Sequence, residues 1–263
     1  MMNSISRIDG ATIQAIDGDI GKVTEAYFDD EKWVIRYLVV DTGNWLASRK
    51  VLISPYSVAH PVPADGPIRL LLNRAQVQNS PDIDTHQPVS RRQEREVLRH
   101  YAYPDYWGGA DLWGVGGFPF LPLMPAVPVL PAVPPSPLQV QMPPEDVHLR
   151  SSADVTGYDI QATDGSIGHV SDFVFDEANW ALRYIVVDTR NWWPGGRKVL
   201  ISPAWIKSIS WEMRSVSVQM TRERVKASPE FDESLVLDRD YEQRLHEAYG
   251  KPGYWDNGDE EQR

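Results

Sequence analysis

IQAIDGDIGKVTEAYFDDEKWVIRYLVVDTGNW, residues Ile13 to Trp45, returns later in the chain as IQATDGSIGHVSDFVFDEANWALRYIVVDTRNW, residues Ile160 to Trp192. About 19 of the 33 aligned positions are identical, and most of the others keep their chemical class. Solenoid repeats have periods of roughly 20–50 residues, so a copy this far along the chain indicates a duplicated domain. The sequence KVLISP, at Lys50–Pro55 and again at Lys198–Pro203, extends both copies.

The repeated stretch has the pattern of β-structure. Asp17-Gly18 and Asp164-Gly165 lie between apolar-rich runs, and Asp-Gly favours the positive φ of a hairpin turn. Val23–Phe28 is a predicted strand. Trp33–Asp41 is predicted to be the central strand, because it is rich in β-branched and aromatic residues. Further short strands follow, and we expect each copy to close into a small β-barrel, because closure removes unpaired edges.

A short helix and a longer helix are expected after the strands of each copy. Asn73 and Thr221 are suitable N-caps for the short helix, and Ser90 and Asp238 are suitable for the longer one. The short helix must end before the Ser-Pro sequence that follows it, because the residue before proline avoids the helical conformation. The fold class is therefore predicted as mainly β with α.

The domain boundaries follow from the aromatic sequences that end both copies, Pro-Asp-Tyr-Trp and Pro-Gly-Tyr-Trp. Residues 4–107 and 150–255 are predicted as two equivalent domains, each able to fold alone. Residues 108–149 are a proline-rich linker, and residues 256–263 are an acidic tail.

The linker has an unusual composition. It has no charged residue from Leu112 to Pro144, and a proline stands at every third position from Pro119 to Pro134. This density of proline argues against a membrane-spanning helix, because proline removes N–H donors and clashes with preceding carbonyls. The period matches polyproline II, which has three residues per turn. Packing against the chain's own domains is favoured, while docking on a partner and contact with a membrane surface stay open.

Composition narrows the classes of function. The 263 residues carry a formal net charge of −11, which argues against a nucleic-acid partner, because affinity for phosphate depends on clustered Lys and Arg. The absence of cysteine excludes disulfides and thiolate metal sites. The N-terminal sequence MMNSISRIDG has no apolar region typical of a secretory signal. We therefore expect a cytoplasmic location, with association at a membrane surface left open.

No motif in the sequence indicates catalysis or cofactor binding. The six histidines lack the spacing of a metal site, and the acidic turns lack the regular oxygen positions of a calcium loop. Nucleophile-elbow, phosphate-loop and dinucleotide fingerprints do not occur. We therefore predict no catalytic, metal-binding or cofactor-binding residue, and no enzyme activity.

Charged residues within the predicted central strands form one group of candidates. Arg36 and Asp41 lie in the first strand, and Arg183 and Asp188 are their equivalents. A charge in a mostly apolar strand must be paired or reach water. We therefore predict structural ion pairs at these positions and consider a docking site the less favoured alternative.

Aromatic side chains form the second group of candidates. Trp193 is expected to be exposed, because its counterpart in the first copy is a leucine in a loop. Polyproline II segments dock into aromatic grooves, so the aromatic residues at the helix ends are the predicted docking place of the linker. These candidate interaction residues are Tyr101, Tyr106, Trp107, Tyr249, Tyr254 and Trp255.

A family resemblance rests on the repeated motifs Asp-Gly, Ile-Gly-x-Val, Trp-x-x-Arg-Tyr, Val-Val-Asp-Thr and Lys-Val-Leu-Ile-Ser-Pro. Over residues 4–72 and 151–220 the chain resembles the PRC-barrel domain. That family takes its name from the H subunit of the photosynthetic reaction centre. The resemblance implies a barrel fold and no particular reaction, because members share the barrel and not a chemistry.

Two functions follow from this resemblance. The favoured one is a non-enzymatic scaffold or interaction protein with an unknown protein partner, whose two repeats pair within the chain. The alternative is an accessory subunit of a membrane redox complex that modulates electron or proton transfer, as the H subunit does. The H subunit is anchored by an N-terminal transmembrane helix, and we expect none ahead of Ile5.

Overall fold

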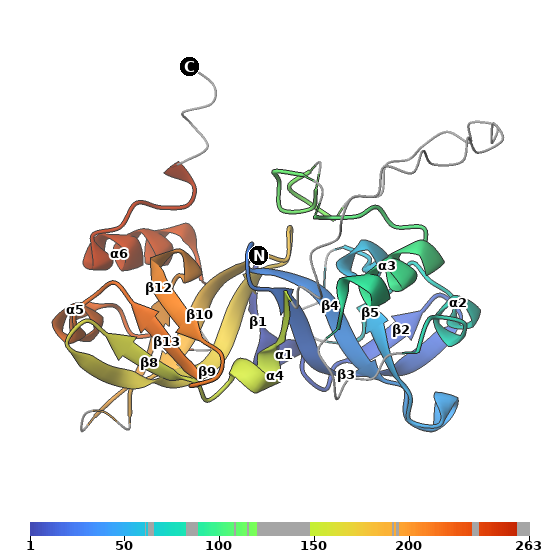
Figure 1. The fold of residues 1–263 in the computed structure, drawn as a ribbon, viewed down its shortest axis with the longest axis horizontal. Helices are drawn as coiled ribbons and strands as arrows, with labels where there is room; N and C mark the ends of the chain where they lie inside the picture. The colour runs from blue at the N-terminus through green and yellow to red at the C-terminus, as the bar shows by residue number, and fades with distance from the viewer. Residues whose placement is uncertain are drawn as a thin grey trace, which may run out of the picture.

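The computed structural model describes residues 1–60, 62, 66–82, 89–107, 109–114, 116–119, 148–190, 192, 195–232 and 237–256. Figure 1 shows two lobes side by side, the first repeat in blue to green and the second in yellow to red. The short helices α1 (Ile5–Ile8) and α4 (Ser152–Val155) lie between the lobes. Each lobe is built on one sheet with its own helices.

The first lobe contains five strands of its own repeat in the order β5-β4-β3-β2-β6. Its elements are β2 (Thr12–Ala15), β3 (Gly18–Asp29), β4 (Val34–Asp41), η1 (Gly43–Leu46), β5 (Lys50–Ile53), η2 (Pro55–Ser57), β6 (Ile68–Arg69), α2 (Arg74–Gln78) and α3 (Arg91–His100). The β2–β6 pair is parallel, and the other pairs are antiparallel.

The second lobe repeats this plan in the order β11-β10-β9-β8-β13-β12. Its elements are β8 (Asp159–Ala162), β9 (Gly165–Asp176), β10 (Leu182–Asp188), β11 (Lys198–Ile201), η3 (Pro203–Trp205), β12 (Ile206–Ser210), β13 (Ser215–Val218), α5 (Arg222–Ala227) and α6 (Arg239–Tyr249). Val23–Phe28 lies within β3 as predicted, and the predicted strand Trp33–Asp41 corresponds to β4, which begins one residue later at Val34.

The fold is mainly β with a modest helical content, as predicted, but the expected closure into barrels is not found in the described parts of the chain. One sheet runs from β5 to β6 and the other from β11 to β12. A 3₁₀ turn that begins with Pro55 follows β5, and one that begins with Pro203 follows β11. Proline has no N–H to donate to a ladder, so strand pairing along β5 and β11 stops at this point.

The two repeats exchange their first strands. Strand β1 (Met2–Ser4) pairs with β9 of the second lobe, and β7 (Leu149–Ser151) pairs with β3 of the first lobe. The exchange is reciprocal, because the Asp30 N–H donates to the carbonyl of His148 while the Glu177 N–H donates to the carbonyl of Met1, both at 3.0 Å. Each lobe therefore contains a strand that belongs to the other repeat.

The central strands also meet across the junction of the lobes. Ile35 donates its N–H to the carbonyl of Trp180 at 2.9 Å, and Leu182 donates to Trp33 at 2.7 Å. The rings of Phe28 and Phe173 lie 5.5 Å apart at this junction. Phe28 and the backbone partners Ile35 and Trp180 are completely buried, so the two repeats share one hydrophobic core.

Local signals in the sequence place the helices as predicted. Asn73 and Ser90 accept hydrogen bonds from the third residue of their helices, and a glutamine completes the capping box in both cases. Thr221 and Asp238 cap the equivalent helices of the second lobe. Within the described ranges, no helix has the length and apolar character needed to cross a membrane.

Candidate functional site

A buried arginine forms the centre of the candidate site in the first lobe. Arg36 extends from β4, is completely buried, and donates to the Asp29 carboxylate at 3.0 Å. Its guanidinium lies over the ring of Tyr106, 3.9 Å from the ring centroid, and beside the ring of Trp113 at 4.8 Å. The charge therefore has one anionic partner and two aromatic faces, which together offset its removal from water.

A buried glutamate from α3 completes this cluster. Glu94 is 1% exposed, accepts a hydrogen bond from the Tyr106 hydroxyl, and pairs with Arg91 at 3.3 Å. Burial raises the pKa of Glu94 to about 7, although Arg91, the Tyr106 hydroxyl and Arg36 favour its charged form. Burial also raises the pKa of Tyr106, so the phenol stays protonated and donates to the carboxylate.

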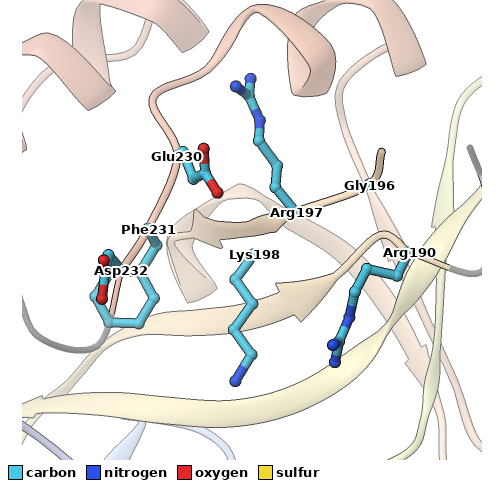
Figure 2. Close-up of a pocket in the computed structure, with 7 residues that line it drawn as sticks. All are labelled: Arg190, Gly196, Arg197, Lys198, Glu230, Phe231 and Asp232. Carbon is cyan, nitrogen blue, oxygen red and sulfur yellow. The ribbon is translucent and has the colours of Figure 1, made fainter. Parts of the chain in front are cut away.

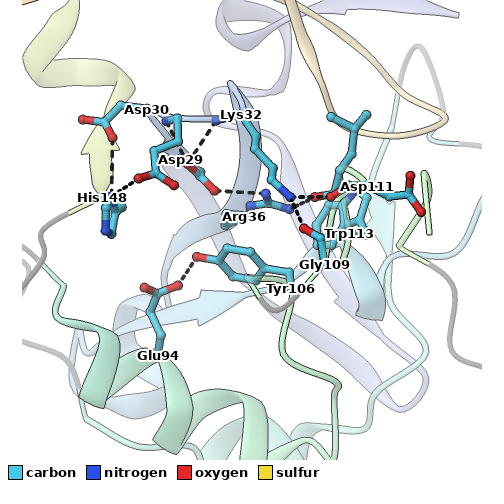
Figure 3. Close-up of polar contacts among 12 residues, drawn as sticks. Asp29, Asp30, Lys32, Arg36, Glu94, Tyr106, Gly109, Asp111, Trp113 and His148 are labelled. Carbon is cyan, nitrogen blue, oxygen red and sulfur yellow. Dashed lines mark hydrogen bonds and ion pairs between the residues drawn. The ribbon is translucent and has the colours of Figure 1, made fainter. Parts of the chain in front are cut away.

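The segment after Trp107 is held on this cluster by its backbone carbonyls (Figure 3). The Lys32 ammonium donates to the carbonyls of residues 109 and 111 at 2.8 and 2.5 Å, and Arg36 donates to the carbonyl of Leu112 at 2.7 Å. The Trp113 indole N–H crosses to the second lobe, where it donates to the carbonyl of Asn179 at 2.8 Å. Trp113 is thereby buried, and the segment covers the Arg36 cluster.

The second lobe contains an equivalent cluster. Arg183 pairs with Asp176 at 3.4 Å and lies over the ring of Tyr254 at 4.1 Å. Glu242 accepts from the Tyr254 hydroxyl at 2.9 Å and pairs with Arg239 at 3.2 Å. The same combination of two arginines, an aspartate, a glutamate and a tyrosine thus occurs once in each lobe.

One residue of the long helix distinguishes the two clusters. His246 takes the place of Leu98, and its ring lies 3.1 Å from the Tyr184 hydroxyl and 2.7 Å from the carbonyl of Pro252. Tyr184 also donates to Glu242 at 2.9 Å. Burial lowers the pKa of His246, which favours the neutral imidazole.

The predicted arginines are paired, but with different partners. Arg36 and Arg183 bind Asp29 and Asp176, and not Asp41 and Asp188. Side chains alternate between the faces of a strand, so two residues five positions apart point to opposite faces and cannot pair. The Asp41 carboxylate instead accepts a hydrogen bond at 2.8 Å from the backbone N–H of Gly43, two residues further along the chain.

Asp188 also has a local role. It binds the side chain and the backbone N–H of Arg190, and the hydrogen bond from the Arg190 guanidinium is the largest contribution that lowers the pKa of Asp188 to about 2. This ion pair lies at the end of β10 and contacts neither cluster.

The aromatic candidates mostly close their own lobes. Tyr101, Tyr106 and Tyr249 are buried, whereas Trp107, Tyr254 and Trp255 are half-buried. Arginines lie over the two tryptophan rings, with Arg91 at 4.8 Å from Trp107 and Arg239 at 4.1 Å from Trp255. Tyr106 packs against Trp113, a residue of the predicted linker of residues 108–149, with the ring centroids 6.4 Å apart. Trp193 and the linker from residue 120 to 147 lie outside the described residues.

The buried acids of the long helices, Glu94 and Glu242, were not predicted from the sequence. Glu94 occurs on the face of α3 that also carries Val97, Leu98 and Tyr101, and all four side chains are buried. Residues at positions i, i+3, i+4 and i+7 share one face of a helix. A charged residue among apolar residues on such a face needs a buried partner. The same spacing places Glu242 on the buried face of α6, so the repeated position was the available signal.

A pocket of about 570 Å³ lies on the second lobe at the start of β11 (Figure 2). In it, Lys198 and Arg190 point to the same side, and Arg197 points away toward the helices. Arg197 donates to the carbonyls of Lys226 and Ser228 at 2.6 Å each, which ties the end of α5 to β11. Arg190 pairs with Asp188, so Arg190 and Arg197 both make contacts within the protein.

Among the residues that the structure describes, no group of three or more His, Asp or Glu side chains could hold a metal ion. Two open sheets of equivalent topology define a duplicated β-domain protein. The PRC-barrel domain model matches residues 1–63 and 149–214. The chain is therefore a PRC-barrel domain protein with two repeats. No curated protein matches the chain.

Proposed function

We propose that this chain is a non-enzymatic scaffold protein whose two PRC-barrel repeats form a rigid support for protein partners. The hydrogen bonds within the buried Arg36 cluster, which includes Glu94, carry this proposal. The Glu94 carboxylate is bonded to Tyr106 and Arg91, and Arg36 is bonded to Asp29 and a backbone carbonyl. A general base must reach a proton on a substrate, and a carboxylate enclosed in this way is suited to a structural role.

The exchange of β1 and β7 supports a scaffold role as well. It fixes the two lobes relative to each other through reciprocal strand pairing. Two binding surfaces on one molecule increase the overall affinity for a partner only when both surfaces can be occupied at the same time. A rigid pair of lobes provides such a fixed geometry.

The test is affinity capture with the tagged full-length chain from cross-linked native cells, followed by reconstitution from purified components. A protein that binds the purified chain in a defined stoichiometry would support the scaffold. A variant that lacks residues 119–144 serves as the comparison and reports whether the linker takes part. Failure of every captured protein to bind in reconstitution would contradict the proposal.

Fractionation tests the proposed cytoplasmic location and the alternative function. We expect the chain in the soluble fraction after a high-salt wash. Retention in the membrane fraction after that wash, together with a redox complex among the captured proteins, would favour the accessory subunit instead.

A further inference from the structure

The two equivalent clusters differ in what covers them. In the first lobe Arg36, Tyr56 and Tyr106 are 0%, 3% and 1% exposed, because residues 109–113 lie over them. At the equivalent positions of the second lobe, the Arg183 side chain is 18% exposed, Ala204 is exposed, and Tyr254 is half-buried. No described residue takes the place of Trp113 there. We call the surface formed by Arg183, Ala204 and Tyr254 the Arg183 face.

The first lobe shows what chemistry fits such a surface. The Trp113 ring packs edge-on against Tyr56 at 4.9 Å, and Arg36 lies 4.8 Å from its centroid. Arg36 binds the backbone carbonyl of Leu112, which precedes that tryptophan. Leu112 and Trp113 lie in a tight turn, which a bridge between Asp111 and Gly114 closes. The cluster therefore recognises a turn that carries a tryptophan, through a charge-assisted hydrogen bond and a cation–π contact.

The C-terminal sequence of the chain does not supply this chemistry for the second lobe. Counted from the Tyr-Trp pair that ends each repeat, Glu260 and Glu261 stand where the first repeat has Leu112 and Trp113. The aromatic anchor is thus replaced by a charged residue. Arg183 makes a single hydrogen bond among the described residues, to Asp176, so its guanidinium keeps donor capacity for a carbonyl.

We propose that the Arg183 face binds a turn-forming segment of another protein, anchored by a tryptophan whose preceding carbonyl accepts a hydrogen bond from Arg183. This inference rests on the proposed scaffold function and names the site and the partner chemistry. The tryptophan takes the position over Arg183 and Ala204 that Trp113 occupies over Arg36 and Tyr56. The partner segment thereby completes the second lobe as residues 109–113 complete the first.

The probe is a fluorescein-labelled peptide with the sequence Gly-Ala-Asp-Leu-Trp-Gly-Val-Gly of residues 109–116. Fluorescence anisotropy with the full-length chain should show saturable binding with one site per chain. The first lobe does not compete for the peptide, because its own segment is tethered and has a local concentration on the order of millimolar. Replacement of the tryptophan by alanine in the peptide should abolish binding.

Three variants of the full-length chain test the position of the site. Arg183→Gln should weaken binding about tenfold, because it removes a hydrogen bond from a charged donor. Ala204→Tyr restores the aromatic partner of the first lobe and should tighten binding about threefold. Arg244→Gln removes an equal charge from an exposed position of α6 and should leave the affinity unchanged.

The outcomes separate this inference from the scaffold proposal. Absence of peptide binding to both the native chain and Ala204→Tyr would overturn the Arg183 face while leaving captured partners unaffected. Binding that neither Arg183→Gln nor Ala204→Tyr alters would place the peptide elsewhere and also overturn it. Self-association that Arg183→Gln abolishes would assign the face to a second copy of the chain. A gain in peptide affinity on removal of residues 257–263 would assign it to the chain's own tail.

Discussion

Ser6 of α1 and Asp172 of β9 join the two repeats through two hydrogen bonds. Ser6 donates its backbone N–H at 3.1 Å and its hydroxyl at 2.5 Å to the Asp172 carboxylate, which is 6% exposed. Without the Asp172 carboxylate, the N–H and the hydroxyl of Ser6 lose their acceptor. Asp172→Ala should therefore lower the free energy of unfolding by about 1–3 kcal/mol. Urea unfolding measures this loss. Asp159→Ala, at an exposed side chain of the same lobe, is the control, and equal effects would contradict the assigned role.

Fragments of residues 1–118 and 148–263 should associate. Each fragment begins with a strand, β1 or β7, that pairs with the other repeat. Each also contains a long strand, β3 or β9, that receives the first strand of the other repeat. We therefore expect each fragment alone to form a dimer by exchange between identical copies, and a mixture to form a one-to-one complex. Light scattering measures the mass of each species. Two stable monomers that unfold cooperatively would instead favour the independent domains expected from the sequence.

Removal of the N-caps of the long helices should destabilise both lobes to a similar degree. Ser90 accepts from the N–H of Gln93, and Asp238 accepts from the N–H of Tyr241. Ser90→Ala and Asp238→Ala should each cost about 0.5–2 kcal/mol in the free energy of unfolding. Ser90→Asp and Asp238→Asn keep the acceptor, and chemical denaturation should place them close to the native chain. A neutral effect of both alanine variants would contradict the cap assignment.

The Glu94 carboxyl should make the stability of the chain depend on pH. Its pKa is about 7 in the folded chain against 4.5 for an ordinary glutamate, so the folded state holds the proton more tightly. The corresponding stability is fully present below pH 4.5 and is lost as the pH rises through 7. A tenfold difference in proton affinity equals about 1.4 kcal/mol.

Glu94→Gln should remove this part of the pH dependence, since the amide cannot titrate. The measurement is the difference in unfolding free energy between the variant and the native chain from pH 4.5 to 8. Glu96→Gln, at an exposed position of the same helix, is the matched control and should follow the native profile. A Glu94→Gln profile parallel to the native one would show that Glu94 stays ionised throughout.

Sequence patterns predicted the strands and helices because their signals are local. The Ile-Gly-x-Val motif is an example, since a Cβ at Gly21 would lie 2.0 Å from the carbonyl oxygen of Asp41. At Gly168 the same test gives 2.0 Å to Asp188, and the φ of +135° adds strain for any other residue. Each glycine allows the central strand to approach the long strand beside it.

The exchange of strands could not be predicted, because the two repeats are nearly equivalent in sequence. The residues that receive β1 in the second lobe resemble those that receive β7 in the first. Pairing within a repeat and pairing between repeats therefore satisfy the same side-chain pattern. The choice depends on the distance that the connecting residues must span, and composition carries no information on that distance.

The candidate site was predicted only in part. The arginines were identified as charges that need partners, but strand alternation excludes the aspartates that were paired with them. The terminal tyrosines were predicted to receive the linker, but their hydroxyls bond to Glu94 and Glu242 on the long helix that precedes each of them. The difference between the two lobes depends on residues 109–113, which belong to the segment that appeared to be linker.

The joining of both repeats in one chain allows their surfaces to diverge. A pair of identical chains that exchanged strands in this way would carry the same residue at both equivalent positions, so a mutation would alter both lobes at once. Here Tyr56 and Ala204 are encoded separately. One half can keep a self-sealed surface that secures the fold while selection acts on the other half alone. Linking both repeats in one chain therefore permits one side of the molecule to specialise without a change in the other.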